Sequence, residues 1–222
     1  MGEATRLRRD AVMAGHEGNH SLALELLGDA DPSIVSAAVG ALLRLGQLRF
    51  GHLAPILARH DGDSALRRRC LRACAQLDEG HRPSPAEIEN SLVGLLDDPD
   101  PTVAETAAFA LGEFGCADTP IIDALSTTTT DHADSLCREA AVAALGALGH
   151  PRGLDAVLAG TTDIATIRRR ATLALAAFTG PEVTARLREL LDDRDRTVRQ
   201  SAEDLLAIID DGKGDSRLVP PD

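Results

Sequence analysis

The sequence contains no Trp and no Tyr, and only four of its 222 residues are Phe. A core without large aromatic side chains has to be filled by Ala, Leu, Val and Ile, which suits closely packed helices. The same lack removes the side chains on which nucleic-acid-binding proteins stack exposed bases. Lys is also scarce, because Lys213 stands alone beside 22 Arg residues.

Long apolar runs and paired cysteines are missing as well. No stretch approaches the roughly 18 apolar residues of a membrane span, and the first fifteen residues lack the apolar run of a secretory signal. The four Cys residues, at positions 70, 74, 116 and 137, form no CxxC pair. Thiols used as small hydrophobic side chains indicate a reducing compartment. We therefore expect a cytoplasmic protein without a membrane segment.

Acidic residues outnumber basic residues by 35 to 23, which gives a formal net charge of −12. Two origins fit this composition: a GC-rich genome, or a salt-loving cytoplasm in which an acidic surface resists salting-out. A large negative charge also disfavours non-specific binding to nucleic acid and to anionic membranes.

What the sequence does contain is a repeat. Six anchor residues open the same pattern, and they are Ile34, Leu66, Val103, Cys137, Ile167 and Val198. Four residues after each anchor stands a small side chain, namely Ala38, Cys70, Ala107, Ala141, Ala171 and Ala202. Successive anchors are 32, 37, 34, 30 and 31 residues apart, a period that is typical of solenoids of stacked supersecondary units.

Each anchor lies at the start of a predicted helix, which we call helix B. Apolar residues at the anchor and at positions +4, +7, +8 and +11 after it would form one buried face. A preceding helix A is predicted at 21–28, 52–60, 85–96, 119–126, 153–160 and 181–191. Asp residues in the turn between A and B are suited to cap helix B.

Further cap signals mark the helix ends. Ser84 and Glu87 form a predicted capping box, with Pro85 at the first helical position. The residues predicted to end helices as left-handed C-caps are Gly46, Gly115, Gly149 and Gly180.

The sequence thus predicts an all-α fold, a right-handed α-solenoid of six helical hairpins over residues 1–210. The predicted capping helix is 3–15, and the repeats are 20–46, 49–78, 84–115, 119–149, 151–180 and 181–210. Residues 211–222 are expected to be disordered. Two insertions, at 78–85 and 126–134, are either tolerated surface loops or binding loops.

The pattern D-x-x-V-R-x-x-A-x-x-A-L-G resembles the short HEAT repeats named after phycobilin lyases. The strongest matches are residues 100–112 and 138–146, and the resemblance covers 20–210. It implies an interaction scaffold in which the B helices line the concave side. It also leaves open two alternatives: a bilin-lyase-like or other cofactor-handling enzyme, and a HEAT-like nucleic-acid-binding protein. A shared fold does not decide between them.

Arginines recur at positions +1 and +2 of helix B. The candidates for partner binding on the concave face are Arg67, Arg68, Arg72, Arg138, Arg168, Arg169 and Arg199. One interpretation is a structural ladder, in which each Arg bonds an Asp of an adjacent turn. The other is a positive stripe that binds an acidic partner segment through Arg–carboxylate forks.

Other chemistry finds little support in the residues. Cys70 and Cys74 occupy repeat core positions without a His to complete a metal site. His16-Glu17 resembles the iron-binding pairs of HEAT-repeat deoxyhypusine hydroxylases, which need several such pairs. No phosphate loop, nucleophile elbow or Ser-His-Asp arrangement is visible. We therefore predict a monomeric, non-catalytic protein–protein scaffold without metal or cofactor.

Overall fold

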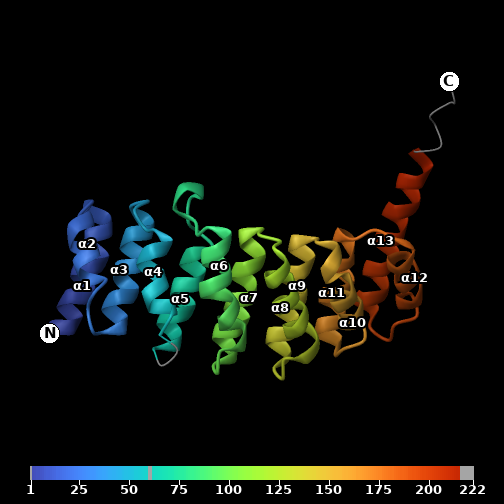
Figure 1. Ribbon diagram of the computed structural model, residues 1–222, viewed down its shortest axis with the longest axis horizontal. Coiled ribbons are helices and arrows are strands. Elements are labelled where there is room, and N and C mark those ends of the chain that lie inside the picture. Colours follow the sequence, from blue (N-terminus) through green and yellow to red (C-terminus); the bar gives the residue numbers. More distant parts are fainter. Residues whose placement is uncertain (1, 60–61, 216–222) are drawn as a thin grey trace. The chain divides into compact units, whose positions relative to one another are not determined.

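The computed structural model describes residues 2–59 and 62–215, with side chains up to residue 211. Within these residues the backbone forms α-helices and short 3₁₀ helices and contains no strand, so the all-helical prediction is confirmed. The chain divides into two compact units, which we call the first unit (residues 1–114) and the second unit (residues 115–222). Figure 1 shows both units as series of helices.

The first unit begins with α1 (Glu3–Glu17), the predicted N-terminal helix, and continues with three hairpins. Their A helices are α2 (His20–Leu26), α4 (Phe50–Leu57) and α6 (Pro85–Leu92), the last extended by the 3₁₀ helix η2 (Val93–Asp97). Their B helices are α3 (Pro32–Arg44), α5 (Ser64–Cys74) and α7 (Pro101–Phe114). The 78–85 insertion forms a loop that contains the 3₁₀ helix η1 (Glu79–His81).

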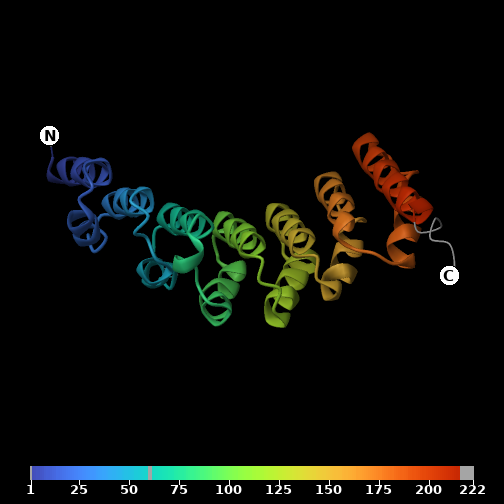
Figure 2. The same cartoon turned by 90° about the horizontal axis from the view of Figure 1, so that it is seen from above.

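The second unit contains the remaining three hairpins. Their A helices are α8 (Thr119–Asp131), α10 (Leu154–Gly160), which follows the 3₁₀ helix η3 (Pro151–Gly153), and α12 (Pro181–Leu190). Their B helices are α9 (Ser135–Leu148), α11 (Ala165–Ala174), which is followed by the 3₁₀ helix η4 (Leu175–Ala177), and α13 (Arg196–Asp215). Within each unit the A helices and the B helices form two layers (Figure 2).

Within each unit the B helices pack on one another in chain order. In the first unit α1 contacts α3, α3 contacts α5 and α5 contacts α7, so that α1 takes the place of a helix B. In the second unit α9 contacts α11, and α11 contacts α13. The predicted small positions lie in these contacts, since Ala38, Cys70, Ala107, Ala141, Ala171 and Ala202 are fully buried. Small side chains therefore permit the close helix packing that the repeat predicts.

Gly146 shows how close this packing is. A methyl group at this position of α9 would lie only 2.6 Å from the Cβ atom of Ala174 in α11. Cys70 and Cys74 are buried core residues, as predicted. Burial raises the pKa of the Cys70 thiol to about 12 and also raises the pKa of Cys74, so both stay protonated.

Most predicted caps are confirmed. The carboxylates of Asp31, Asp63 and Asp134 accept hydrogen bonds from backbone N–H groups of the first helical turn that follows each of them. The Ser84–Glu87 capping box is present. Among the predicted C-caps, Gly46, Gly115 and Gly149 have φ angles of 64°, 67° and 60°.

The prediction for Gly180 was wrong. This glycine has φ 141° and ψ 166°, a conformation that residues with a side chain rarely adopt, and it is the N-cap of α12 rather than a left-handed helix end. The preceding helical segment instead closes with η4 and the extended Phe178. Gly18, with φ 76°, is a left-handed C-cap of α1 that the repeat pattern did not indicate.

Two predicted irregular segments are helical. Helix α8 continues to Asp131, so most of the predicted 126–134 loop belongs to helix A. Its Thr side chains satisfy their hydroxyl groups on carbonyls four residues earlier, as Thr128 does on Ala124 and Thr129 on Leu125. Helix α13 continues to Asp215, while residues 216–222 of the predicted disordered tail lie outside the described residues.

None of the helices in the described residues is both long enough and apolar enough to cross a bilayer.

Candidate binding surface on the B helices

The predicted arginines fall into two groups in the structure. Arg67 and Arg168 are only 2% and 5% exposed, and Arg138 is also largely enclosed. Arg72 and Arg169 are exposed, whereas Arg68 and Arg199 are half-buried. Two members of the predicted stripe are therefore out of reach of a partner.

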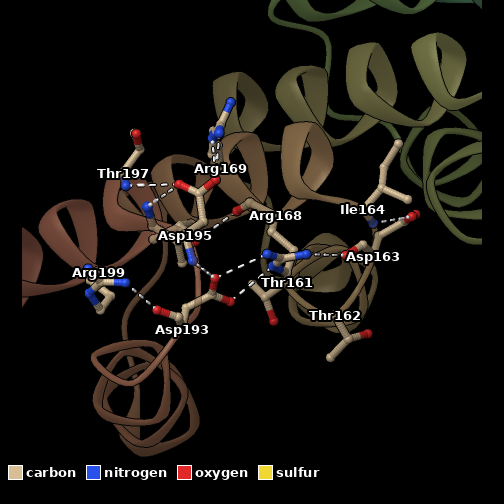
Figure 3. Close-up of polar contacts among 12 residues, drawn as sticks. Thr161, Thr162, Asp163, Ile164, Arg168, Arg169, Asp193, Asp195, Thr197 and Arg199 are labelled. Carbon is tan, nitrogen blue, oxygen red and sulfur yellow. Dashed lines mark hydrogen bonds and ion pairs between the residues drawn. The ribbon is translucent and has the colours of Figure 1, made fainter.

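The enclosed arginines, all at position +1, form ion pairs with the turn of the next hairpin. Arg168 Nε lies 2.9 Å from Asp193 Oδ2, and Arg168 Nη2 lies 3.1 Å from Asp193 Oδ1 (Figure 3). Arg138 makes the same two-pronged contact with Asp163, at 2.8 and 3.1 Å. In the first unit, Arg67 pairs with Asp98, and both side chains are buried.

The same guanidinium groups also hold the turn before their own helix. Nη1 of Arg168 donates to the carbonyl oxygen of Asp163 at 2.9 Å, and Nη1 of Arg138 donates to that of His132 at 2.8 Å. Arg199, in the last described hairpin, keeps only this contact, at 2.7 Å to the carbonyl of Asp193. Position +1 thus ties together successive turns, which is the structural ladder described as one interpretation of the sequence.

Two of the ladder carboxylates, Asp98 and Asp193, belong to a short turn motif. In the last hairpin, Asp193 Oδ1 accepts the N–H of Asp195 at 2.7 Å, and Asp195 Oδ1 accepts the N–H of Thr197 at 2.9 Å (Figure 3). Asp98, Asp100 and Thr102 repeat this arrangement in the first unit. The second Asp caps helix B, and the first Asp receives the arginine of the preceding helix B.

These contacts lower the pKa of the carboxylates involved. The hydrogen bond from Arg138 lowers the pKa of Asp163. For Asp193, burial acts to raise the pKa, but the bonds from Arg168 and from the N–H of Asp195 outweigh it and lower the pKa. The bond from Arg169 lowers the pKa of Asp195 to about 2. All three carboxylates are therefore ionised at neutral pH, and their charges are used in contacts within the protein.

Three of the candidates for partner binding are already engaged within the fold, since the guanidinium groups of Arg67, Arg138 and Arg168 bind Asp98, Asp163 and Asp193. Arg169, at position +2, is also paired, with its Nε 3.0 Å from Asp195 Oδ2. The sequence contains a signal for this outcome. Each ladder Asp stands four or five residues before the next anchor, where the turn must start.

Other arginines in the first unit have no such partner. Arg44 of α3 and Arg69 and Arg72 of α5 make no ion pair or side-chain hydrogen bond with the residues that the structure describes. Arg69 lies across Gly40 of α3, since a methyl group there would be 2.8 Å from Arg69 Nη2. Arg44 lies across Gly15 of α1 in the same way, since a methyl group at Gly15 would be 2.7 Å from Arg44 Nη1. Arg44 and Arg69 were not identified as binding candidates from the sequence.

Two exposed apolar side chains lie on the same face of helix B. Phe109 of α7 and Leu173 of α11 both occupy position +6, and each is 51% exposed. Arg72 occupies position +6 of α5. The core pattern did not single out position +6. A large apolar residue at a position that is Gly, Arg, Ala or Asp in the other B helices is the signal that could have found these two.

Leu173 borders a shallow, open depression of about 220 Å³ within the second unit. Its walls come from α9, α11 and η4, and they are formed by Ala143, Gly146, Arg170, Leu173, Ala174, Ala176 and Ala177. Arg170 stands at its edge, with Nη2 3.7 Å from Glu139 Oε1. The depression is apolar at its base and charged at this edge, which suits an apolar side chain of a partner.

No three His, Cys, Asp or Glu side chains in residues 2–59 and 62–211 are grouped so that they could hold a metal ion. His16 and Glu17, the predicted isolated pair, are both exposed in the last turn of α1.

The helical hairpins have counterparts among known proteins. The family described as HEAT repeats matches three overlapping stretches of the chain, residues 51–146, 88–163 and 122–207. None of the curated proteins matches the sequence.

Several solved structures share the fold at low identity. An engineered protein is 21% identical, with a TM-score of 0.60, over 87% of this chain and 99% of its own. The complex of the CpcE and CpcF proteins of phycocyanin lyase from a Nostoc species is 21% identical, with a TM-score of 0.54, over 82% and 74%. UNC-45 from Drosophila melanogaster is 15% identical, with a TM-score of 0.55, over 90% and 32%. Likeness at these identities concerns the fold alone.

Proposed function

We propose that this chain, which belongs to the HEAT-repeat family, is a non-catalytic scaffold that binds a protein or peptide on the exposed face of its B helices. Solenoids of this kind present extended surfaces for binding rather than enclosed reaction sites. The proposal rests on one observation above all, the exposed apolar side chain that Phe109 and Leu173 each place at position +6. We further propose, from the composition, that the protein acts as a monomer in the cytoplasm.

The surroundings of Leu173 support this proposal. Small residues from α9, α11 and η4 leave a depression beside it, and Arg170 supplies a guanidinium at the edge. Protein–protein interfaces are enriched in aromatic side chains and arginine, and their strongest contacts lie in apolar pockets that exclude water. The surface thus combines an apolar site at Leu173 with the guanidinium of Arg170, which can form directional hydrogen bonds.

The two alternatives gain nothing specific from the structure. Likeness to phycocyanin lyase is a likeness of fold at 21% identity, and no feature of the B helices favours a tetrapyrrole over a peptide. A nucleic-acid function would have to overcome a formal net charge of −12.

Affinity capture with matched variants tests the proposal. The full chain, Leu173→Ser and Leu191→Ser are immobilised, exposed to native lysate at physiological salt, and the captured proteins are quantified by mass spectrometry. Leu191 is 39% exposed and ends α12, an A helix, so Leu191→Ser removes an exposed leucine of the same unit that is not on a B helix. We expect Leu173→Ser to lower capture of the main partner at least about fivefold, with Leu191→Ser retaining it. Equal capture by all three proteins would refute the proposed face.

A further inference from the structure

The first unit carries positive charge that the fold does not use. We infer that its B helices bind an acidic peptide segment through Arg44, Arg69 and Arg72, and that Phe109 receives an apolar side chain of the same segment. This inference rests on the proposed function and deepens it, because it names the chemistry of the partner and the unit that recognises it. We call Arg44, Arg69 and Arg72 the arginine patch.

The arginine patch differs from the enclosed arginines of this protein. The enclosed arginines Arg67, Arg138 and Arg168 all have carboxylate partners. Within the described residues, none of the three patch arginines forms an ion pair, and Arg44 and Arg72 are exposed. Arg68 is left out of the patch, because it already acts electrostatically on Asp100. Unpaired guanidinium groups that gather on one face favour a ligand that brings its own carboxylates.

Two glycines position the patch. Gly40 leaves the space in which Arg69 crosses from α5 onto α3, and Gly15 leaves the space in which Arg44 crosses from α3 onto α1. One side of each of these two guanidinium groups therefore lies against the neighbouring helix. This placement restricts the side chains before a ligand arrives, so less rotamer entropy remains to be lost on binding.

The acidic residues around the patch define its limits. Helix α1 carries Asp10 and Glu17, and helix α7 carries Glu105 and Glu113, yet none of these four pairs with a patch arginine in the described structure. On α7 the residue at position +6 is Phe109, one hairpin after Arg72. A peptide that places carboxylates over α3 and α5 would therefore place its next side chain over Phe109, where an apolar group fits best.

The same features favour a peptide over nucleic acid. A phosphate backbone presents negative charge along its whole length, and so it would meet Glu105 and Glu113 as well as the arginines. A peptide can alternate acidic and apolar side chains to match this surface. Two-pronged bonds between guanidinium and carboxylate groups also provide orientation as well as affinity.

Fluorescence anisotropy on the full chain tests the inference. The probe is a fluorescein-labelled 12-residue peptide of Asp, Glu and Leu, and its matched control has the same sequence with Asn and Gln in place of the acids. The charge variant is Arg69→Gln with Arg72→Gln. The control variant is Arg188→Gln with Arg194→Gln, two exposed arginines of the second unit that also lack an ion pair within the described residues. Circular dichroism confirms that each variant is folded.

We expect the acidic peptide to bind the natural chain and the amide peptide not to bind. The Arg69→Gln, Arg72→Gln variant should raise the Kd at least about tenfold, whereas the control variant should change it less than about twofold. Phe109→Ser should weaken binding of the acidic peptide as well. Gly40→Ala adds a second test without a charge change, because the new methyl group displaces the Arg69 guanidinium while Ala favours the helix. It should weaken peptide binding severalfold without lowering the melting temperature.

Three outcomes would overturn the inference. The acidic peptide fails to bind, or it binds equally well to the Arg69→Gln, Arg72→Gln variant, or a dT12 oligonucleotide binds more tightly than the peptide through the same arginines. If Leu173→Ser still abolishes partner capture in any of these cases, the proposed function stands and only the arginine patch is refuted. If capture is insensitive to Leu173→Ser, the proposed function fails independently.

Discussion

The first and second units are built from the same hairpin but use arginine differently. In the second unit, Arg138, Arg168 and Arg169 of the B helices each reach an Asp of the following turn. In the first unit only Arg67 does so, and the remaining arginines of α3 and α5 stay without an ion pair in the described structure. The same residue type thus joins successive hairpins at some positions and leaves unpaired guanidinium groups on α3 and α5.

The difference shows that the neighbouring turn decides what a repeat arginine does. Position +1 becomes structural where the next turn starts with an Asp, as it does at Asp98, Asp163 and Asp193. Position +1 of α3 is Val35, a buried apolar residue that needs no such partner. At position +2, Arg169 also reaches the following turn, at Asp195, whereas Arg69 and Arg72 of α5 form no ion pair in the described structure.

The largest effect is expected from breaking the buried rung of the first unit. Arg67→Ala would leave the buried Asp98 carboxylate without its counter-charge, which should lower the free energy of unfolding by about 3–5 kcal/mol. Arg72→Ala, on the exposed face of the same helix, should change it by less than about 0.5 kcal/mol. Urea unfolding monitored by circular dichroism measures both variants. A similar loss of unfolding free energy in both variants would show that the ion pair with Asp98 does not make Arg67 more important for stability than Arg72.

Leucine-to-alanine variants compare the cores of the two units. Leu111 and Leu145 occupy position +8 of α7 and α9, and both are essentially fully buried. Each substitution should cost about 2–5 kcal/mol through lost burial and cavity formation. Hydrogen exchange monitored by mass spectrometry shows where the destabilisation falls. We expect Leu111→Ala to raise exchange in the first unit and Leu145→Ala to raise it in the second. Uniform exchange across both units in either variant would contradict local packing.

The N-caps allow a finer comparison. Asp63 caps α5 by accepting the N–H of Leu66 at 2.7 Å, and Asp134 caps α9 by accepting the N–H of Leu136 at 2.8 Å. Replacing either by Ala should lower stability by about 1 kcal/mol, because a donor of the first helical turn loses its partner. Asn at the same positions should retain most of the stability. Thermal unfolding of the four variants tests this, and a loss in the Asn variants equal to that in the Ala variants would point to charge instead of capping.

Much of this fold can be predicted from the sequence because its packing is local. Helix B starts two residues before each anchor, where the Asp-rich turn ends, and the small residues after the anchor are buried as expected. The Thr-rich stretch after Ser126 was misjudged, since low helix propensity was outweighed by bonds from the Thr hydroxyls to the helix and by burial of Thr128 and Thr129.

The candidate surface was harder to predict. Arg67 and Arg72 look alike in the sequence, and only the structure shows that one lies against Asp98, 31 residues away, and the other faces solvent. The exposure of Phe109 and Leu173 also depends on the angle at which neighbouring helices pack. The repeat predicts which face of a helix is buried, but it does not specify how far the exposed face is covered by side chains from the next hairpin.

The smallest expected effect concerns two carboxylates, one in each unit, whose ionisation stabilises the fold at acidic pH. Asp100 in the first unit has its pKa lowered to about 2, chiefly by hydrogen bonds from Thr102 and Ser64, whereas Asp195 in the second unit reaches about 2 chiefly through Arg169. Both carboxylates titrate below their ordinary pKa of 3.8, so their contribution is present above pH 3.8 and is lost as the pH falls towards 2. The melting temperature should therefore decrease over this interval.

Salt should separate the two carboxylates. The Arg169–Asp195 pair is partly exposed and will be screened, whereas hydrogen bonds from hydroxyl groups depend little on ionic strength. Raising NaCl to about 1 M should move the pKa of Asp195 back towards its ordinary value and leave the pKa of Asp100 nearly unchanged. Carboxyl-detected NMR titration measures both groups in one sample. An equal salt shift at both would mean that the carboxylates of the two units are held by the same kind of interaction, against the contrast drawn from their contacts.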